Sequence, residues 1–130
     1  MVIDTSAVIA ILWEEPLARR LASAINASGV RLISAVSLVE AALVMEGRQG
    51  EEAGRDLDLF RFRTKLELVP VDEYQAEQAR IAWRRFGKGR HKAGLNLGDC
   101  FSYALAKTRR LPLLFCGDDF PHTDIEPALR

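Results

Sequence analysis

Acidic residues occupy positions in this chain where an ordinary solvated acid is not expected. Asp4 directly follows two β-branched apolar residues, and Glu40 lies inside an apolar stretch. Asp99 precedes another apolar stretch, and Asp118 and Asp119 follow a third. An acid that is buried without a partner shifts its pKa or destabilises the fold, so each of these acids needs hydrogen bonds or a cation.

If these carboxylates converge on one pocket, a hard divalent cation is the simplest way to relieve their mutual repulsion. All-oxygen ligands favour Mg²⁺ or Mn²⁺. Such a cation can orient a phosphodiester, lower the pKa of a bound water and stabilise charge on the leaving oxygen, which is metal-assisted phosphodiester hydrolysis. The alternative is a set of scattered structural acids. It is strongest for Asp99, because the helix dipole favours an acid three residues after an asparagine cap.

The spacing of apolar residues predicts the elements that position these acids. A strand over residues 2–3 ends at Asp4, and Thr5 and Ser6 offer hydroxyl caps for a helix over residues 7–12. The adjacent strand and helix place Asp4 at the point where they join.

Two more of the acids fall within predicted helices. Ser34 or Ser37 caps the helix that contains Glu40, and Asn96 caps the helix whose first turn contains Asp99. The helix around Glu40 is predicted to end at Gly47. Further helices are predicted from Pro16 to before Gly29, over 51–65 and over 72–86, and further strands over 30–33, 67–71 and 113–115.

Strands and helices alternate along the whole chain, and no linker, repeat or change of composition divides it. This pattern predicts an α/β fold with a mainly parallel sheet, formed by a single domain over residues 1–130. Ligands of such sheets gather at the carboxyl ends of the strands. Because Asp4 follows the first predicted strand and Asp118 and Asp119 follow the last, we expect acids distant in sequence to meet at one sheet edge.

The composition excludes several classes of protein. Apolar residues make up 48% and charged residues 28% of the 130 residues, which is typical of a globular chain and not of a disordered one. Lys and Arg number 18 and so do Asp and Glu, so any polyanion site must be local. No apolar stretch approaches the roughly 20 residues of a membrane helix, and the N-terminus lacks the features of a secretory signal. We therefore expect a cytoplasmic protein, with Cys100 and Cys116 as free thiols.

One local basic segment is a candidate polyanion site. Arg84, Arg85, Lys88, Arg90 and Lys92 lie in a glycine-containing stretch without an acid. A solvated loop explains this run equally well. The single histidine within it is more simply a bystander than a general acid.

Four segments match one known family in their order along the chain. They are VIDTSAVIAIL (2–12), ISAVSLVEAALV (33–44), GLNLGDCFSYALAK (94–107) and PLLFCGDDFPHTDI (112–125). They span nearly the whole chain, and the last two together are specific. The sequence therefore resembles the PIN-domain family, and within it the VapC-type ribonuclease toxins of prokaryotic toxin–antitoxin pairs.

The resemblance implies a three-layer α/β/α fold in which Asp4, Glu40 and Asp99 match the three central carboxylates of PIN nucleases. Asp4 and Asp99 are the implied direct ligands of Mg²⁺ or Mn²⁺. Glu40 would bind the ion through water or orient the attacking water. We expect Asp118 to be the fourth acid, with Asp119 as the alternative.

Two hydroxyl residues beside the first acid also match the family. Thr5 and Ser6 could donate hydrogen bonds to carboxylates or to a phosphate, although capping the helix explains them equally well.

The resemblance also implies partners. The substrate would be RNA, such as a tRNA cut at a defined loop, and a cognate VapB-like antitoxin would block the site. The basic segment would then contact RNA phosphates. Family members commonly form homodimers. Apolar faces for the antitoxin or a second copy could come from Leu17, Leu21 and Ile25, or from Leu57 and Phe60, although core packing is the simpler explanation.

Other functions remain open. A phosphotransferase with an aspartyl nucleophile would use Asp4, but Ser6 stands where its second acid is expected. A nucleotide-binding module is suggested by Gly87, Gly89 and Gly94, but their spacing is not GxGxxG and they follow a predicted helix. A PIN-like interaction module without nuclease activity is the third alternative.

Overall fold

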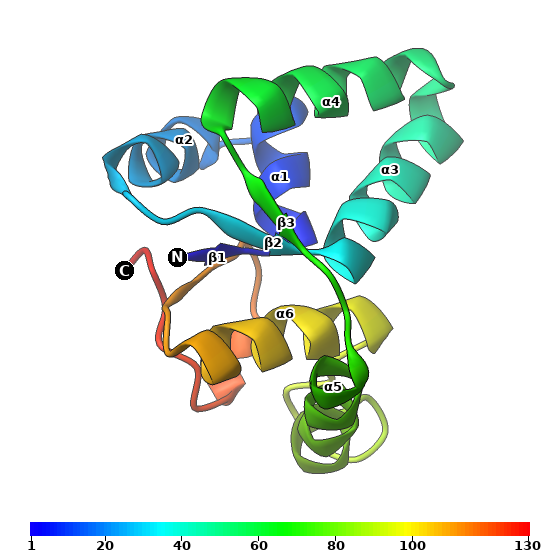
Figure 1. Ribbon diagram of the computed structural model, residues 1–130, viewed down its shortest axis with the longest axis vertical. Coiled ribbons are helices and arrows are strands. Elements are labelled where there is room, and N and C mark those ends of the chain that lie inside the picture. Colours follow the sequence, from blue (N-terminus) through cyan, green and yellow to red (C-terminus); the bar gives the residue numbers. More distant parts are fainter.

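The computed structural model describes residues 1–130 and contains a parallel sheet between two layers of helices (Figure 1). This is the three-layer α/β/α arrangement expected from the sequence. In chain order the elements are β1 (Val2–Ile3), α1 (Thr5–Leu12), α2 (Ala18–Ala27), β2 (Leu32–Ser34), α3 (Ala35–Gln49), α4 (Glu52–Thr64), β3 (Glu67–Val69), α5 (Glu73–Phe86), α6 (Leu97–Arg109), β4 (Leu113–Leu114) and a 3₁₀ turn, η1 (Phe120–His122).

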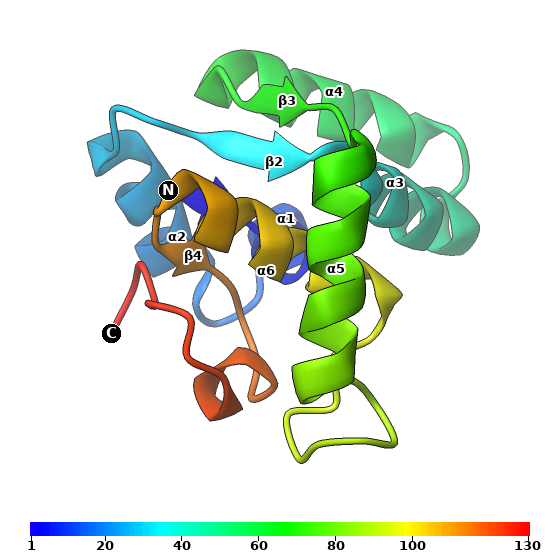
Figure 2. The ribbon, with the colours of Figure 1, turned by 60° about the horizontal axis from the view of Figure 1, so that its bottom comes forward.

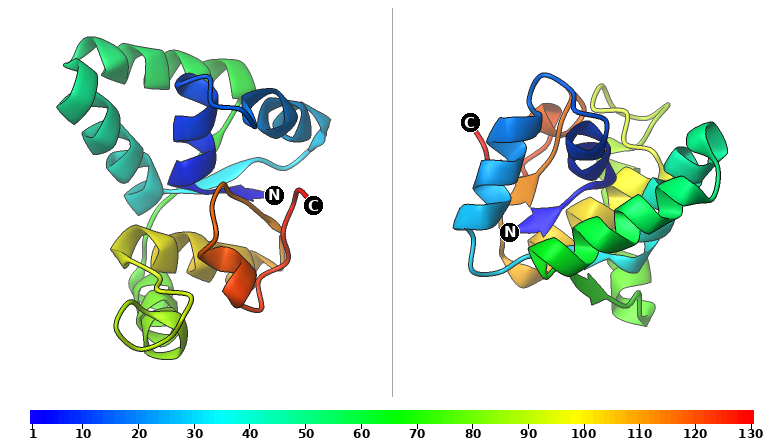
Figure 3. Two further views of the ribbon diagram at one scale, coloured as in Figure 1. Left: turned by 180° about the vertical axis from the view of Figure 1, so that it is seen from behind. Right: turned by 90° about the horizontal axis from the view of Figure 1, so that it is seen from above.

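The sheet has the strand order β3-β2-β1-β4, and every neighbouring pair is parallel. Helices α1 to α4 cover one face, and α5, α6 and the C-terminal segment cover the other (Figures 1 and 2). The view from behind shows the same two layers on either side of the sheet (Figure 3, left). Because β1 lies between β2 and β4, the residue that follows β1 is placed at the middle of the carboxyl edge of the sheet.

Alternation along the short strands divides the core into two halves. Val2 and Leu113 point to the cluster under α5 and α6, whereas Ile3 and Leu114 point to the cluster under α1 to α4. All four side chains are fully buried. This alternation is the period of two that a β-strand requires, and it fixes the register that sends Asp4 past the end of the sheet.

Several boundaries differ from those predicted. Helix α2 begins at Ala18, with Leu17 at its N-cap, so Pro16 lies before the helix and not at its first position. Helix α3 passes through Gly47 and ends at Gln49, and its C-cap is Gly50, whose φ of 84° is readily adopted only by glycine. A single glycine inside an otherwise well-packed helix does not stop it, because tertiary packing outweighs the unfavourable propensity of about 1 kcal/mol.

The apolar residues expected at a partner interface are largely part of the core. Leu21, Ile25 and Leu57 are buried, and Phe60 packs against the same cluster. Of that set only Leu17 is exposed. Both cysteines are free thiols, as expected. None of the helices is both long and apolar enough to span a lipid bilayer.

Candidate acidic active site

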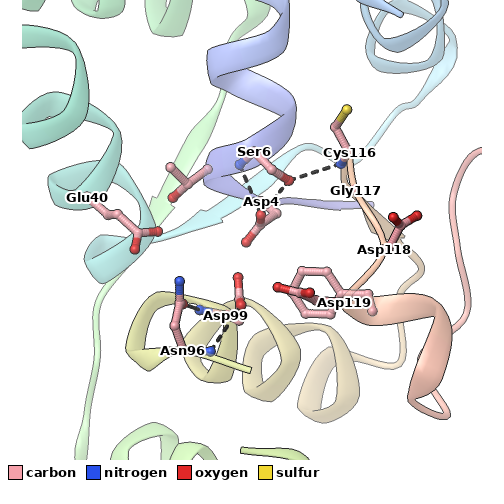
Figure 4. A pocket seen from close by; sticks show the side chains of 11 residues that line it. Asp4, Ser6, Glu40, Asn96, Asp99, Cys116, Gly117, Asp118 and Asp119 are labelled. Carbon is pink, nitrogen blue, oxygen red and sulfur yellow. Dashed lines mark hydrogen bonds between the residues drawn. The ribbon is translucent and has the colours of Figure 1, made fainter. Parts of the chain in front are cut away.

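A pocket of about 390 Å³ opens at the carboxyl ends of β1 and β4. The structure brings all five acids singled out in the sequence to this pocket, and no Lys, Arg or His lines it (Figure 4). The eleven lining residues are Asp4, Thr5, Ser6, Glu40, Asn96, Asp99, Cys116, Gly117, Asp118, Asp119 and Phe120. Its lining is therefore negative and rich in oxygen atoms.

Asp4 lies at the base of the pocket and is only 2% exposed. Its Oδ2 accepts hydrogen bonds from the Ser6 amide (2.9 Å) and the Ser6 hydroxyl (2.6 Å). Its Oδ1 accepts one from the Ser102 hydroxyl at 2.5 Å. These three donors stabilise the negative charge of a carboxylate that has almost no contact with solvent.

The N-cap of α1 is Asp4 itself, so the prediction that Thr5 or Ser6 caps this helix is wrong. Both hydroxyl residues lie within the first turn. The Ser6 hydroxyl bonds the carboxylate, while the Thr5 hydroxyl donates to the Ser37 carbonyl oxygen at 2.8 Å. The acid takes over the capping role because its side chain follows the strand directly and reaches the free amide at the start of the helix.

Asp99 sits in the first turn of α6, in a capping box with Asn96. The Asn96 amide donates to Asp99 Oδ2 at 3.1 Å, and the Asp99 amide donates to Asn96 Oδ1 at 2.9 Å. Burial, followed by the charge of Asp4, raises the pKa of Asp99 to about 7, and the charges of Asp119 and Glu40 add to this rise. Asp99 and Asp4 point toward one another (Figure 4).

Glu40 reaches the pocket from α3, where its carboxylate lies over the start of α6. Any side chain at Gly98 would overlap this carboxylate, so the glycine makes room for the acid. Burial, and then the charge of Asp4, raises the pKa of Glu40. Glu40 thus belongs to the same electrostatic cluster as Asp4 and Asp99.

Asp118 and Asp119 are exposed and come from the turn after β4, which begins at Gly117 with a φ of 113°. Their side chains lie differently in the pocket. The charge of Asp119 acts on Asp99, whereas the charge of Asp118 contributes to the raised pKa of the Cys116 thiol. In Figure 4, Asp119 lies on the side of Asp99, and Asp118 lies farther out.

The donor set suits a hard divalent cation. Burial, and after it the charges of the neighbouring acids, raise the pKa of Asp99, and no ion pair involves any acid of this pocket. No three His, Cys, Asp or Glu side chains form a ready-made cage for a metal ion. Mg²⁺ rarely needs one, since it keeps several waters and binds through one or two carboxylates together with substrate phosphates. Asp4 and Asp99 can supply those carboxylates.

The basic segment lies outside this pocket. Arg85 is tied to Asp124 at 3.5 Å and to the Tyr103 hydroxyl at 3.3 Å, while Arg90 stacks over the ring of Trp83. Lys88 lines a groove between α5 and α6 that shares Asn96 with the acidic pocket. Arg84 and Lys92 are exposed. His91 accepts a hydrogen bond from the Ala93 amide and packs against Phe86, so it plays no part in the pocket.

Three residues support the acids in a way that the sequence did not indicate; one of them, Ser37, was expected only as an alternative helix cap, and the cap of α3 is Ser34. Ser37 and Ser102 are fully buried hydroxyls, and Gly98 is the contact point for Glu40. The only available signal was a small polar residue three positions from an acid on a helix, since Ser37 precedes Glu40 and Ser102 follows Asp99 by three. That spacing places each serine one turn from its acid.

Comparisons with known proteins agree with this architecture. Residues 1–126 match the PIN domain family. The chain is 57% identical over 125 residues to the ribonuclease VapC30 of Mycobacterium tuberculosis, covering 96% of this chain and 95% of the relative. It is 56% identical over 125 residues to the ribonuclease VapC of Mycolicibacterium smegmatis, covering 96% and 97% of the two chains.

Two solved structures share the fold. The crystal structure of M. tuberculosis VapC20, described as a sarcin-ricin loop cleaving toxin, superposes with a TM-score of 0.73 at 18% identity and covers 97% of this chain and 98% of that one. A toxin–antitoxin complex from Klebsiella pneumoniae gives a TM-score of 0.67 at 20% identity, with 95% and 92% covered. With the matches over nearly its full length, the chain belongs to the PIN-domain family and, within it, to the VapC-type ribonuclease toxins.

Proposed function

We propose that this protein is an endoribonuclease that uses Mg²⁺ or Mn²⁺ to hydrolyse RNA phosphodiester bonds. The observation that carries the proposal is the convergence of five carboxylates on one pocket that contains no cationic side chain. Scattered structural acids would not meet in this way, and an RNA phosphate could not approach such a pocket unless a cation were bound there. The ribonuclease names of its close relatives support the same conclusion.

Each acid has a distinct role in this proposal. Asp4 and Asp99 bind the divalent ion directly, and Asp4 does so from a carboxylate fixed by three hydrogen bonds. When bound, the ion polarises the attacking water and stabilises charge on the leaving oxygen. Glu40 orients that water and accepts its proton, which suits an acid whose pKa is raised by burial. Thr5 and Ser6 keep these groups in place.

For the fourth acid we propose Asp119. Its charge acts on Asp99, while that of Asp118 acts on Cys116 instead. A comparison of Asp118→Asn and Asp119→Asn tests this choice, because only loss of the true fourth acid should reduce cleavage strongly. Equal activity of the Asp119 variant and the unchanged protein would restore Asp118 as the candidate.

The substrate we propose is a structured RNA, such as a tRNA cut at a loop. The related VapC20 is named for cleaving the sarcin-ricin loop, so a ribosomal RNA fragment belongs in the same panel. An RNA-cleaving role places the protein in the cytoplasm, where its free thiols Cys100 and Cys116 would remain reduced.

The decisive experiment incubates antitoxin-free protein with end-labelled total tRNA and ribosomal RNA, in Mg²⁺ or Mn²⁺ and in EDTA. We expect a discrete product that requires the metal. Asp4→Asn and Asp99→Asn should each lower the cleavage rate by more than about 100-fold, because each removes a charge that binds the ion. Asp56→Asn, an exposed acid on α4, is the matched control. Full cleavage in EDTA would refute the metal mechanism, and full cleavage by either variant would refute the role assigned to that residue.

A cognate antitoxin and a second copy of the chain are the proposed protein partners. The structural neighbour from K. pneumoniae is a toxin–antitoxin complex, which supports an antitoxin for this chain. Large apolar side chains exposed on α3 and α4 offer surfaces for such partners, namely Val39, Leu43, Val44, Leu59 and Phe62. Light scattering of the isolated chain tests the homodimer, and a monomer at micromolar concentration would argue against it.

A further inference from the structure

We infer that Ser102, supported by Ser37, is a positioning residue that holds the Asp4 carboxylate in the orientation needed to bind the cation. The inference rests on the proposed metal-dependent function. It concerns two fully buried serines on different helices that do not themselves line the pocket. Their hydroxyl groups form a chain that ends on Asp4.

The geometry of this chain fixes the direction of its protons. Ser102 Oγ donates to Asp4 Oδ1 at 2.5 Å, and Ser37 Oγ lies 2.8 Å from Ser102 Oγ. A hydroxyl carries one proton, so Ser102 has none left to give and Ser37 must be the donor in their contact. Both protons therefore point toward the carboxylate.

The other oxygen of Asp4 is supported in the same way. Ser6 Oγ donates to Asp4 Oδ2 at 2.6 Å, and the Cys116 amide donates to Ser6 Oγ at 3.0 Å. Each carboxylate oxygen thus receives a hydroxyl that is itself oriented by a further donor. This paired arrangement locks the rotation of the carboxylate and leaves one of its four lone-pair sites, on Oδ1, free for a cation.

This hydroxyl relay, the hydrogen-bonded pair Ser37 and Ser102, also connects the elements that carry the other acids. Ser37 lies on α3, one turn before Glu40, and Ser102 lies on α6, one turn after Asp99. A contact between the two serines consequently sets the spacing between those helices beside both acids. Thr5 adds a third link, because its hydroxyl donates to the Ser37 carbonyl oxygen.

Ordinary packing does not account for these hydroxyls. A serine inside a helix usually faces solvent or bonds a carbonyl of its own preceding turn. Ser37 and Ser102 instead are fully buried and direct their hydroxyls across elements. Alanine would fill both positions with less desolvation, so the hydroxyl groups serve the carboxylate that they contact.

The test measures Mn²⁺ affinity by titration calorimetry on the purified full chain. We expect Ser102→Ala to raise the Kd for Mn²⁺ by about 10-fold or more, and Ser37→Ala to raise it less, because Ser37 acts only through Ser102. Cleavage by Ser102→Ala should return toward the normal rate at saturating Mn²⁺. Thr108→Ala is the matched control, since it removes a hydroxyl from the same helix that bonds Gln75 and Leu105, away from the pocket.

The outcomes separate the inference from the proposed function. If Ser102→Ala and Thr108→Ala lower the melting temperature alike but both bind Mn²⁺ as tightly as the unchanged chain, the two serines are structural and the inference is overturned. If the unchanged chain itself fails to bind Mn²⁺, the metal hypothesis is refuted and the inference falls with it. A selective rise in Kd for Ser102→Ala, with smaller change in Ser37→Ala, supports it.

Discussion

Asp4 and Asp99 face each other, but their carboxylates accept unequal numbers of hydrogen bonds. Asp4 accepts three hydrogen bonds, whereas Asp99 accepts one, from the Asn96 amide, and stands among the charges of its neighbours. The negative charge of Asp99 is therefore the less stable of the two when no cation is present. In the proposed function a bound divalent ion would remove this penalty, and metal binding would then be coupled to deprotonation of Asp99.

This imbalance predicts how stability depends on pH in the metal-free protein. The pKa of Asp99 is raised from 3.8 to about 7, so between these values the folded state holds a proton that the unfolded state has lost. The free energy of unfolding should therefore fall as the pH rises through this window. Chemical denaturation in EDTA from pH 4 to pH 8 measures the effect.

The matched variant for this pH dependence is Asp99→Asn, which keeps an oxygen to accept from the Asn96 amide. We expect it to be more stable than the unchanged chain by about 1–2 kcal/mol at pH 8 and equally stable at pH 4. An identical pH profile for both proteins would show that Asp99 ionises normally.

At the scale of elements, the place of the Glu40 carboxylate between α3 and α6 depends on one glycine. Gly98→Ala should displace the Glu40 carboxylate and lower the cleavage rate by about 10-fold, because a misplaced catalytic group is costly. Gly47→Ala is the matched control within α3, since open space surrounds that position. It should raise the free energy of unfolding by about 0.5–1 kcal/mol and leave cleavage unchanged. Cleavage by Gly98→Ala at the normal rate would contradict the proposed role of Glu40.

The segment after α5 yields a prediction about RNA binding. Arg84, Lys88 and Lys92 are exposed and have no acidic partner, so changing all three to Gln should weaken RNA binding and reduce its dependence on salt. The slope of log K against log salt should become shallower by up to about 2. The control variant changes three exposed residues of α2 and α4 to Gln, namely Arg19, Arg55 and Arg63, and so removes the same charge elsewhere. An equal loss in both triple variants would show that only net charge matters.

The elements also show how far the sequence could be used for prediction. The helix caps Asp72 and Asn96 were identifiable, Asp72 from Gln75 three positions later and Asn96 from the helical run that follows it, whereas Ser34 was one of two candidates with Ser37. The convergence of the acids followed from the parallel topology. The hydroxyl relay and the role of Gly98 were not predictable, because they depend on how α3 and α6 cross, and that angle is set by packing among many residues.

At the scale of the whole molecule, two tryptophans report on the two layers of the predicted single domain. Trp13 lies at the end of α1, and Trp83 lies on α5 across the sheet. Val2 packs in one half of the core and its neighbour Ile3 packs in the other. Because both residues belong to one strand, we expect the two layers to unfold together. Trp13→Phe leaves only Trp83 to report by fluorescence, and Trp83→Phe leaves only Trp13. Urea titrations of the two variants should give the same midpoint once the effect of each substitution on stability is subtracted. Separate midpoints would reveal two folding units.

Because β1 is a central strand, the backbone of Asp4 on one side of the pocket is held by the sheet, whereas the backbone of Asp118 and Asp119 on the other side is not. The Asp4 amide donates to the Leu114 carbonyl at 2.9 Å, whereas the amides of Asp118 and Asp119 donate to no backbone partner. We expect the hydrogen on the Asp4 amide to exchange with solvent only when the sheet opens, and those on the Asp118 and Asp119 amides to exchange faster. We therefore expect the Asp4 side of the pocket to persist as long as the fold itself, and the turn after β4 to open more often.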